Sequence, residues 1–308
     1  MNLINDFTAY LSRELNYSGN TVAAYRRDLL QWADFATSGN TDSLVVDDVT
    51  TSDVRLWTAS LAKSGIAPRS IRRKVQSLRS FFRFLMRNGI VASNPASDII
   101  LARLPKDLPV YIRQTETMDL IDNSTIGNSD FEQLRDRLIL NMFYSTGMRC
   151  SELITLLDAN VDSLRRELKV HGKRNKDRLI PYGEELAEMI ERYRKLRDSD
   201  PATAICSRDR DATFFVRSNG LPLYRKAVYN IVHAAMLQTG VHARRLSPHV
   251  LRHSFATDML NDGAPITSVQ QLLGHSSLVS TQVYTHITYR ELQQNYQLAH
   301  PRAQKKGG

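Results

Sequence analysis

A proline-flanked segment near residue 105 divides the chain into two parts of unequal length. It reads Leu104-Pro105-Lys106-Asp107-Leu108-Pro109. Proline lacks a backbone N–H and fixes its own φ, so two prolines around a polar pair resist both a helix and a central strand. The 308 residues are enough for two domains, each with its own core. We therefore expect a domain of residues 1–104, a linker of residues 105–110, a second domain of residues 111–300 and a flexible tail of residues 301–308.

The first part of the chain carries apolar residues at helical spacing throughout. In the segment that follows Thr51-Ser52-Asp53, this spacing puts Val54, Trp57 and Leu61 on one face of a predicted helix. Asn94-Pro95 indicates a last short helix of residues 96–104. The first domain is therefore predicted to be all helical.

The predicted helix of residues 69–87 carries charges of one sign only. No Asp or Glu occurs between Lys63 and Arg87. A solvated helix face normally mixes signs, and a one-sign run repels itself unless it meets an anion. The net charge of +9 also favours a polyanionic partner, nucleic acid first. We therefore expect this helix to contact DNA phosphates, with a merely solvated face as the alternative. The candidate contact residues are Arg69, Arg72, Arg73, Lys74, Arg79 and Arg83.

The second part of the chain is predicted to combine helices with one β-hairpin. Residues 168–171 and 178–181 alternate between apolar and polar side chains and flank a basic turn. The turn carries Lys173, Arg174 and Lys176, which could be solvated or could reach a phosphate. The fold class that follows is mainly α with a small β-sheet, an all-helical first domain preceding a mixed α+β second domain.

Arg149 and Glu152 lie where one predicted helix ends and the next begins. Gly147 can provide the left-handed residue that stops the first helix. Backbone N–H groups at the start of the next helix favour an anion, and Arg149 adds a planar fork of donors for phosphate or carboxylate oxygens. Glu152, one turn later, can hold that fork in place. An ordinary ion pair at a helix start is the alternative.

Histidine, arginine and tyrosine recur inside a helical pattern in the C-terminal part. His249 and Arg252 are three residues apart, so they share a helix face. Gly274 ends the next helix and leaves His275 at a turn, and Tyr284 follows nine residues later. Taken singly, each of these residues has an ordinary explanation as a surface or core residue.

Six side chains together suit the transfer of a phosphoryl group from DNA to a side-chain oxygen. They are Arg149, Lys173, His249, Arg252, His275 and Tyr284. The transition state is a phosphorane whose equatorial oxygens carry the charge, and arginines aimed at those oxygens stabilise it. A tyrosine can serve as the nucleophile, although its reference pKa of about 10 requires help from a base and a cationic field.

In these stretches the sequence resembles the tyrosine recombinase (phage integrase) family, in particular its Xer-type members. Residues 146–153 resemble the family's first-arginine motif, and residues 172–176 resemble its hairpin lysine motif. Residues 247–257 are similar to its His-x-x-Arg box, and residues 272–286 look like its last box, which ends in the nucleophile. The motifs occur in the family's order and spacing, and the resemblance covers nearly the full length of the chain.

The resemblance implies the roles of the groups that move protons and form the covalent bond. Tyr284 would attack the scissile phosphate to give a 3′-phosphotyrosyl bond and a free 5′-hydroxyl. His249 would assist as base, and Lys173 would be the general acid. Arg174 stands where relatives often have Gly, which leaves open whether Lys173 or Lys176 reaches the leaving oxygen.

The resemblance also implies which groups bind the phosphate. Arg149 and Arg252 would bind the non-bridging oxygens, His275 would donate a hydrogen bond, and Glu152 would support them from behind. Because the phosphotyrosyl bond conserves the energy of the broken diester, neither ATP nor a metal cofactor is implied. His249 and His253 lie four residues apart, but no Glu lies between them and no third ligand is obvious, so a zinc site is not expected.

The partners implied by the resemblance are double-stranded DNA and further recombinase subunits. The first domain would be the family's SAM-like core-site-binding domain. The C-terminal helix with Leu292 and Tyr296 would dock on a neighbouring subunit, giving a tetramer on two paired sites. Whether the tetramer is a homotetramer or includes a second Xer-type recombinase, and whether a DNA translocase activates it, stays open.

The sequence argues against a membrane or secreted protein. No apolar run reaches the roughly 18 residues of a membrane span, and the N-terminus has no secretory pattern. Cys150 and Cys206 lack metal-type spacing and indicate reduced thiols, so we expect a cytoplasmic protein.

The expected function is site-specific recombination, of the Xer type that resolves chromosome or plasmid dimers. An integrase or invertase of a mobile element would use the same chemistry. Less favoured alternatives are a type IB topoisomerase, which needs no specific site, and a DNA-binding protein that forms no covalent adduct.

Overall fold

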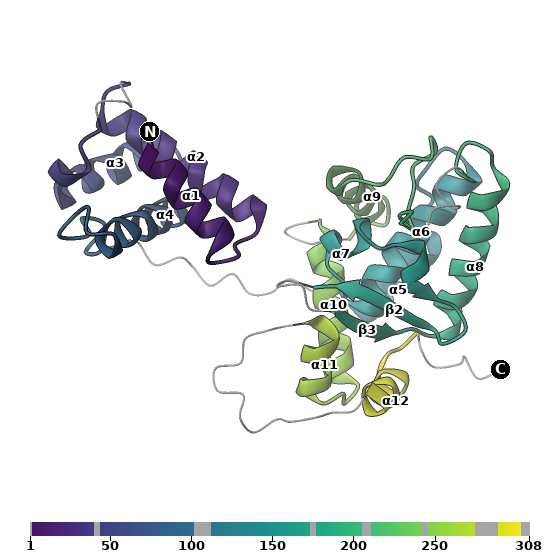
Figure 1. Cartoon of the computed structure of the whole chain (residues 1–308). Helices are drawn as coiled ribbons and strands as arrows, with labels where there is room; N and C mark the ends of the chain where they lie inside the picture. Colours follow the sequence, from purple (N-terminus) through teal and green to yellow (C-terminus); the bar gives the residue numbers. More distant parts are fainter. Residues whose placement is uncertain are drawn as a thin grey trace. The chain divides into compact units, whose positions relative to one another are not determined.

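The chain forms two compact units, Met1–Asp107 and Leu108–Gly308 (Figure 1). The structure is a computed structural model, and it describes residues 2–39, 44–101, 112–172, 177–204, 211–241, 246–274 and 289–302. Across these residues the chain is mainly helical with one small antiparallel sheet, as the sequence predicted. None of the helices among them combines the length and the apolar character needed to cross a bilayer.

The described residues of the first unit form four α-helices. They are α1 (Asn2–Arg13), α2 (Gly19–Ala36), α3 (Thr51–Lys63) and α4 (Pro68–Arg87), with a short 3-10 turn at Val46–Asp48. Local sequence sets the helix starts. The Ser18 hydroxyl accepts from Thr21 N at the start of α2, Thr50 and Asp53 form a reciprocal capping box at α3, and Pro68 is the first residue of α4.

Aromatic side chains make up much of the core of the first unit. Phe7, Trp32, Trp57, Phe81 and Phe82 are each at most 1% exposed. The rings of Phe7, Trp32, Phe81 and Phe82 meet edge to face: the centroids of Trp32 and Phe82 lie 5.6 Å apart at 75°, and those of Phe7 and Phe81 lie 5.5 Å apart at 68°. This geometry is preferred by aromatic quadrupoles, and it packs α1 and α2 against α4.

The prediction of a short helix at residues 96–104 is wrong for residues 96–101, the part of this segment that the structure describes, because these residues form turns and irregular backbone. Asn94 Oδ1 accepts from Ala96 N at 3.0 Å, which closes a local turn instead of a helix. The Arg79 side chain donates hydrogen bonds to the backbone carbonyls of Ala96, Ser97 and Ile99, at 2.8, 3.2 and 2.6 Å. A long-range guanidinium therefore replaces the hydrogen bonds that a helix would have formed.

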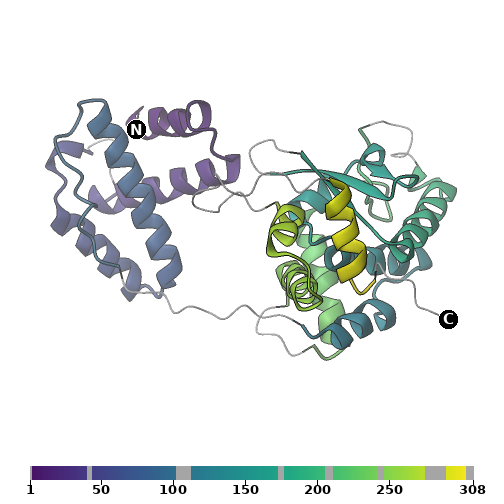
Figure 2. The same cartoon turned by 90° about the horizontal axis from the view of Figure 1, so that it is seen from below.

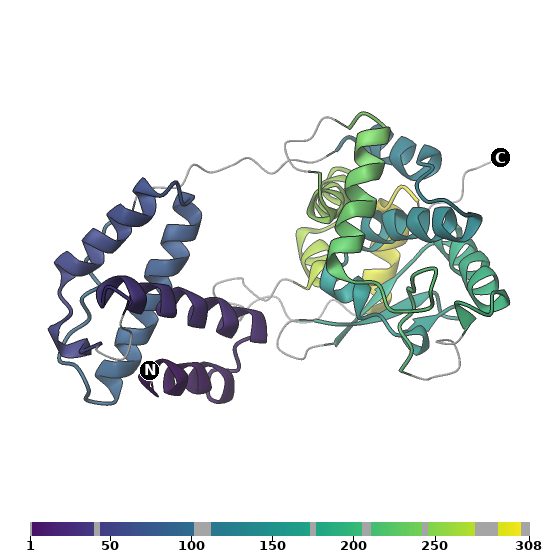
Figure 3. The same ribbon diagram turned by 90° about the horizontal axis from the view of Figure 1, so that it is seen from above.

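The second unit surrounds one long buried helix, α6 (Asp130–Thr146). Residues from Phe131 to Thr146 are buried on nearly every face of it, as expected of a helix enclosed on all sides. Its neighbours include α5 (Gln114–Asn123), α8 (Glu184–Ser199), α9 (Arg225–Gln238) and α10 (Pro248–Asn261). Figure 3 shows α9 lying across this group of helices.

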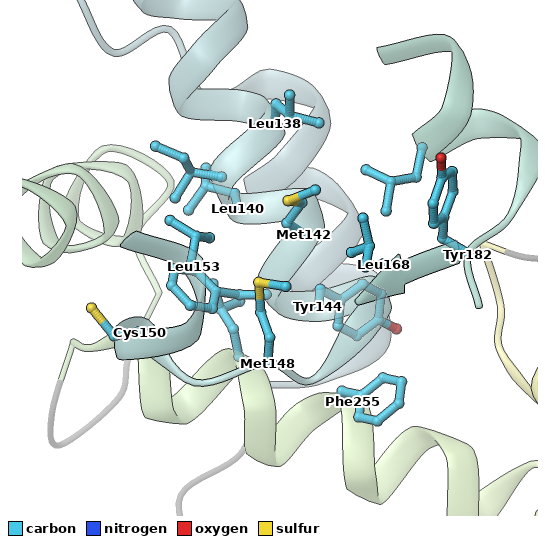
Figure 4. Packing of buried hydrophobic residues seen from close by; sticks show 14 of the residues in the cluster. Leu138, Leu140, Met142, Tyr144, Met148, Cys150, Leu153, Leu168, Tyr182 and Phe255 are labelled. Carbon is cyan, nitrogen blue, oxygen red and sulfur yellow. The ribbon is translucent and has the colours of Figure 1, made fainter. Parts of the chain in front are cut away.

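The sheet of the second unit has three antiparallel strands in the order β1-β2-β3. They are β1 (Val161–Asp162), β2 (Glu167–His171) and β3 (Asp177–Pro181), and Lys169 pairs with Leu179. β2 and β3 are the predicted hairpin, and the short strand β1 was not predicted. Leu168, Val170 and Ile180 are buried in the same hydrophobic cluster as Tyr144, Met148 and Phe255, and Figure 4 labels Leu168 together with these last three.

The C-terminal helix α12 (Tyr289–Ala299) lies beside α10 and α11 (Ile266–Leu273), which Figure 2 shows from below. Tyr296 is 1% exposed and stacks on the fully buried ring of His300, with 5.1 Å between the ring centroids. The Arg302 guanidinium forms ion pairs with Asp122 and Glu185. The end of the helix is thus part of the core of its own unit.

Candidate active site

Gly147 fixes the turn that brings Arg149 to the site. It ends α6 with a φ of 60°, the left-handed conformation that glycine adopts without strain. A Cβ atom here would lie 2.4 Å from Cδ1 of Phe255 on α10, so a larger residue would push these two helices apart. Two residues later Arg149 is the N-cap of α7 (Cys150–Ile154).

Arg149 is held to Glu152 by both its backbone and its side chain. The Arg149 backbone N–H donates to Oε2 of Glu152 at 2.7 Å, and Nη1 donates to Oε1 at 2.8 Å. Nη2 donates to the Gly274 carbonyl at 2.9 Å. The Arg149 side chain keeps 28% of its area exposed while that of Glu152 keeps 3%, so the carboxylate lies behind the guanidinium.

Arg178 on β3 also belongs to this cluster, and the sequence analysis missed it. Its Nη1 and Nη2 donate to the two oxygens of Glu152 at 2.8 and 2.9 Å, and its Nε donates to the Leu272 carbonyl at 2.8 Å. The signal was present in the strand alternation. Arg178 shares a strand face with buried Ile180, and a guanidinium on the core face of a strand needs a buried partner.

Arg252 comes from the first turns of α10 and is 8% exposed. Its Nη2 donates to the Leu273 carbonyl at 2.7 Å, and its Nη1 donates to the Gly147 carbonyl. Burial, together with the nearby charge of Arg149, lowers the pKa of Arg252 to about 10. The guanidinium is therefore still charged at neutral pH, in surroundings where a charge acts strongly.

Three arginines from three different elements converge on the C-terminal end of α11. Arg178, Arg252 and Arg149 donate to the consecutive carbonyls of residues 272, 273 and 274. The last carbonyls of a helix have no partner within the helix and carry its negative dipole end, so they suit cationic donors. The last turn of α11 thereby fixes the spacing of the three guanidiniums.

Glu152 stays ionised in this cluster although it is buried. Burial acts to raise the pKa of its carboxyl, but the hydrogen bonds and charges of Arg178 and Arg149 outweigh burial and hold the pKa below its usual range. The stability that ionised Glu152 contributes is present above the ordinary carboxyl pKa and is lost as the pH falls through the lowered value.

His249 lies three residues before Arg252, at the exposed start of α10. Partial desolvation, followed by the charges of Arg252, His253, Arg225 and Arg149, lowers the pKa of its imidazole. The ring is therefore neutral at neutral pH and can accept a proton. Arg225 at the start of α9 adds positive charge here, a contribution that the motif analysis did not identify.

The other predicted site residues lie outside the described residues. These are Lys173, Arg174, Lys176, His275 and Tyr284. Of the predicted catalytic set, the structure thus brings together Arg149, Arg252 and His249, with Glu152 behind them. Among the described residues no group of His, Cys, Asp and Glu could hold a metal ion.

The predicted DNA-contacting residues of α4 divide into buried and exposed groups. Lys74 is 7% exposed, and its ammonium donates to Gln31 and, at 3.1 Å, to the fully buried Asp28. Arg73 pairs with the same carboxylate. Part of the negative charge that the basic residues of α4 need as a partner therefore comes from Asp28 of α2.

Arg79 also has a structural role, because its guanidinium donates the hydrogen bonds to the carbonyls of Ala96, Ser97 and Ile99 that are described above. Arg69, Arg72 and Arg83 lie on the exposed face of α4.

Comparisons with known proteins cover both units. Residues 111–291 match the group described as "Phage integrase family", and residues 4–89 match "Phage integrase, N-terminal SAM-like domain". The chain is 37% identical to the tyrosine recombinase XerC of Chlorobaculum parvum over 318 residues, covering 97% of this chain and 94% of that one. It is 33% identical to the XerC of Bacillus subtilis over 305 residues, covering 99% and 98%.

Solved structures show the same fold at lower identity. The Tn1549 transposon integrase in complex with transposon right end DNA has a TM-score of 0.70 at 21% identity, covering 94% of this chain and 96% of that one. The XerH site-specific recombinase bound to its difH substrate has a TM-score of 0.66 at 18% identity, covering 89% and 79%.

Proposed function

This chain belongs to the phage integrase family and is a site-specific tyrosine recombinase, and from that premise we propose how its residues break and rejoin DNA. Arg149 and Arg252 bind the non-bridging oxygens of the scissile phosphate. Charge builds up on these oxygens when the phosphate becomes five-coordinate, and preorganised guanidiniums stabilise that charge without having to reorganise.

One observation carries this assignment. Arg149 and Arg252 come from α7 and α10, yet they donate to the adjacent carbonyls of Gly274 and Leu273. Two cations drawn together in this way repel each other, and after burial the charge of Arg149 is the next cause that lowers the pKa of Arg252, so the arrangement favours an anion between them. Tyr284 follows ten residues after Gly274, which lets the chain return to the same place.

Tyr284 is proposed as the nucleophile. Its phenolic oxygen attacks the phosphorus, the bond to the 5′ oxygen breaks, and a 3′-phosphotyrosyl ester forms. The neutral imidazole of His249 accepts the phenolic proton, and Lys173 or Lys176 gives a proton to the departing 5′ oxygen. His275 donates a hydrogen bond to the phosphate. Attack by a 5′-hydroxyl on the ester then rejoins the strand.

The covalent bond provides the test. Sites recovered by sequencing the DNA bound to the protein in cells would be built into a duplex nicked beside the cleavage point, which traps the cleaved strand. The full chain should form a covalent adduct, Tyr284→Phe should form none, and the control Tyr17→Phe, at a tyrosine that is 41% exposed, should form it as the wild type does. An adduct that persists in Tyr284→Phe would refute the role of this tyrosine.

The cellular role that we propose is the resolution of chromosome or plasmid dimers by a tetramer on two paired sites. The full-length relatives named XerC support an Xer-type role. A second recombinase of the same type and an activating DNA translocase fit this role. Deletion of the gene should leave a fraction of dividing cells with unseparated chromosomes, whereas the loss of integration or inversion of a mobile element would favour the alternative role.

A further inference from the structure

The buried carboxylate of Glu152 is shared by two arginines of unequal exposure. Arg178 binds both of its oxygens with a planar fork, and its side chain is 12% exposed. Arg149 binds the same oxygens through one side-chain N–H and its backbone N–H, and its side chain is 28% exposed. The more buried guanidinium therefore makes the bidentate pair, and the more exposed one makes the looser contact.

The charges of this cluster do not cancel. Glu152 contributes −1, while Arg149, Arg178 and Arg252 contribute +1 each, which leaves a net charge of about +2 beside the place proposed for the phosphate. Without Arg178 the carboxylate would have Arg149 as its nearest cation. A buried ionised carboxylate needs a paired cation, so it would draw Arg149 inward and offset its charge.

Arg178 is fixed in its position by contacts other than Glu152. Its Nε donates to the Leu272 carbonyl, and its side chain lies directly under Gly274, where a Cβ atom would come within 3.1 Å of Nη1. The side chain is therefore held on β3 and α11 whether or not a phosphate is bound, as a permanent counter-charge must be.

From this geometry we infer that Arg178 is a positioning residue for strand cleavage, which neutralises Glu152 so that Arg149 keeps its charge and its orientation for the phosphate. The inference rests on the proposed function of Arg149. It adds a residue from the hairpin strand β3 to the site, at a position that contacts neither the phosphate nor Tyr284 in the proposed mechanism.

The first experiment measures single-turnover cleavage of the nicked duplex and, separately, the Kd for the same duplex. Arg178→Met should lower the cleavage rate about 10²-fold, the typical effect of a small misplacement of a catalytic group, and change the Kd by less than about threefold. Arg178→Lys keeps the charge but loses the fork, so its loss should be smaller. Cleavage by Arg178→Met at the wild-type rate would overturn the inference.

A matched control separates this role from general stability. Arg194 on α8 is also a partly buried arginine that pairs with a carboxylate, that of Asp158, at a side-chain exposure of 20%. Arg194→Met should lower thermal stability without changing the cleavage rate at temperatures where the protein stays folded. An equal loss of cleavage in Arg194→Met would mean that the loss in Arg178→Met comes from the fold.

The decisive experiment compares the effect of R178M with and without the charge of Glu152, which is the charge that Arg178 offsets. In an E152Q background a neutral amide needs no counter-ion, so adding R178M should cost less than about threefold in cleavage rate, against about 10²-fold in the wild-type background. The cost of R178M within the E152Q background can be measured even if R178M alone does not fold, because the double variant leaves no unpaired buried charge. A loss in the E152Q background as large as in the wild type would overturn the inference.

A pH profile gives an independent readout. The charged groups that face Glu152 are Arg149, Arg178 and Arg252. Without Arg178, burial would raise the pKa of Glu152, so the deficit of Arg178→Met relative to wild type should shrink as the pH falls and the carboxyl is protonated. A deficit that stays constant from about pH 8 to pH 5.5 would contradict the charge role.

The same assays distinguish this inference from the proposed function. If the wild-type protein forms no Tyr284-dependent adduct, the proposed function itself fails. If the wild type and Arg178→Met form the adduct equally fast, only the inference fails.

Discussion

Each unit of the molecule contains a buried carboxylate that binds two cationic side chains. In the first unit Asp28 on α2 accepts from Arg73 and Lys74 of α4. In the second unit Glu152 on α7 accepts from Arg149 and Arg178. Asp28 is fully buried and Glu152 is 4% exposed, so both carboxylates lose most of their hydration and need these partners.

The two clusters differ in where the cations come from and what else they bind. Arg73 and Lys74 are neighbours on one helix. The Lys74 ammonium also donates a hydrogen bond to Gln31, which lies one turn from Asp28 on α2. That cluster joins two helices. Arg149 and Arg178 come from separate elements, and both continue to carbonyls at the end of α11.

The difference shows what decides whether a buried ion pair supports packing or chemistry. The buried pair of Lys74, whose side chain is 9% exposed, and Asp28 mainly determines how α2 and α4 pack, because desolvation offsets most of the attraction between the two charges. Partial exposure of one cation does not separate the two clusters, because the side chain of Arg73 is 43% exposed and that of Arg149 is 28% exposed. In the second unit the exposed cation is also fixed by the carbonyl of Gly274, and Arg178 offsets the charge of the carboxylate. The site then presents a positive charge that is already in place.

The largest effect is expected from breaking the cluster of the first unit. Asp28→Ala would leave the ammonium of Lys74 buried without its carboxylate, which should lower the free energy of unfolding by about 3–5 kcal/mol. Chemical denaturation of the full chain measures this change. Asp34→Ala on the exposed face of the same helix is the control, with an expected change within about 0.5 kcal/mol. Equal stability of the two variants would remove the packing role of the Asp28 cluster.

The second prediction concerns the cluster of the second unit, where catalysis should suffer more than stability. Arg252→Met should lower single-turnover cleavage about 10²- to 10³-fold, the usual effect of removing one donor to a developing charge. Arg135→Met is the matched control, because that guanidinium is 6% exposed and pairs with Asp136 on the same helix. It should lower stability and leave the cleavage step unchanged. Cleavage by Arg252→Met within threefold of wild type would contradict the comparison.

Much of the fold could be predicted because its signals are local. Helical spacing, the proline that begins α4, the glycine at the end of α6 and the alternation on both sides of the hairpin turn each act within a few residues. The helix expected after Asn94 failed for a non-local reason. Arg79, fifteen residues earlier, takes the carbonyls that a helix would need, and no window around Asn94 contains that information.

The candidate site also has residues that local motifs predicted and residues whose role depends on distant parts of the chain. Arg149, Glu152, His249 and Arg252 occur in short motifs, and the structure brings them together. The partnership of Arg178 with Glu152 spans 26 residues, and it depends on the pairing of β3 with β2. The burial of Lys74 depends on Asp28, 46 residues earlier. Sequence identified the basic residues of α4 but could not tell which of them a distant carboxylate would bind.

The smallest effect tests which cations of α4 remain available to DNA. Arg69 and Arg83 lie 14 residues apart, close to four helical turns, so they share the exposed face of α4 opposite its buried residues. Each should contact about one phosphate. Arg69→Gln should therefore reduce the slope of log Kobs against log salt concentration by about 1 and leave thermal stability unchanged. Lys74→Gln should leave the salt slope unchanged and lower thermal stability, because the Lys74 ammonium is paired with Asp28 inside the unit. A salt slope that falls equally in both variants would show that burial against Asp28 does not remove Lys74 from the DNA-facing charge.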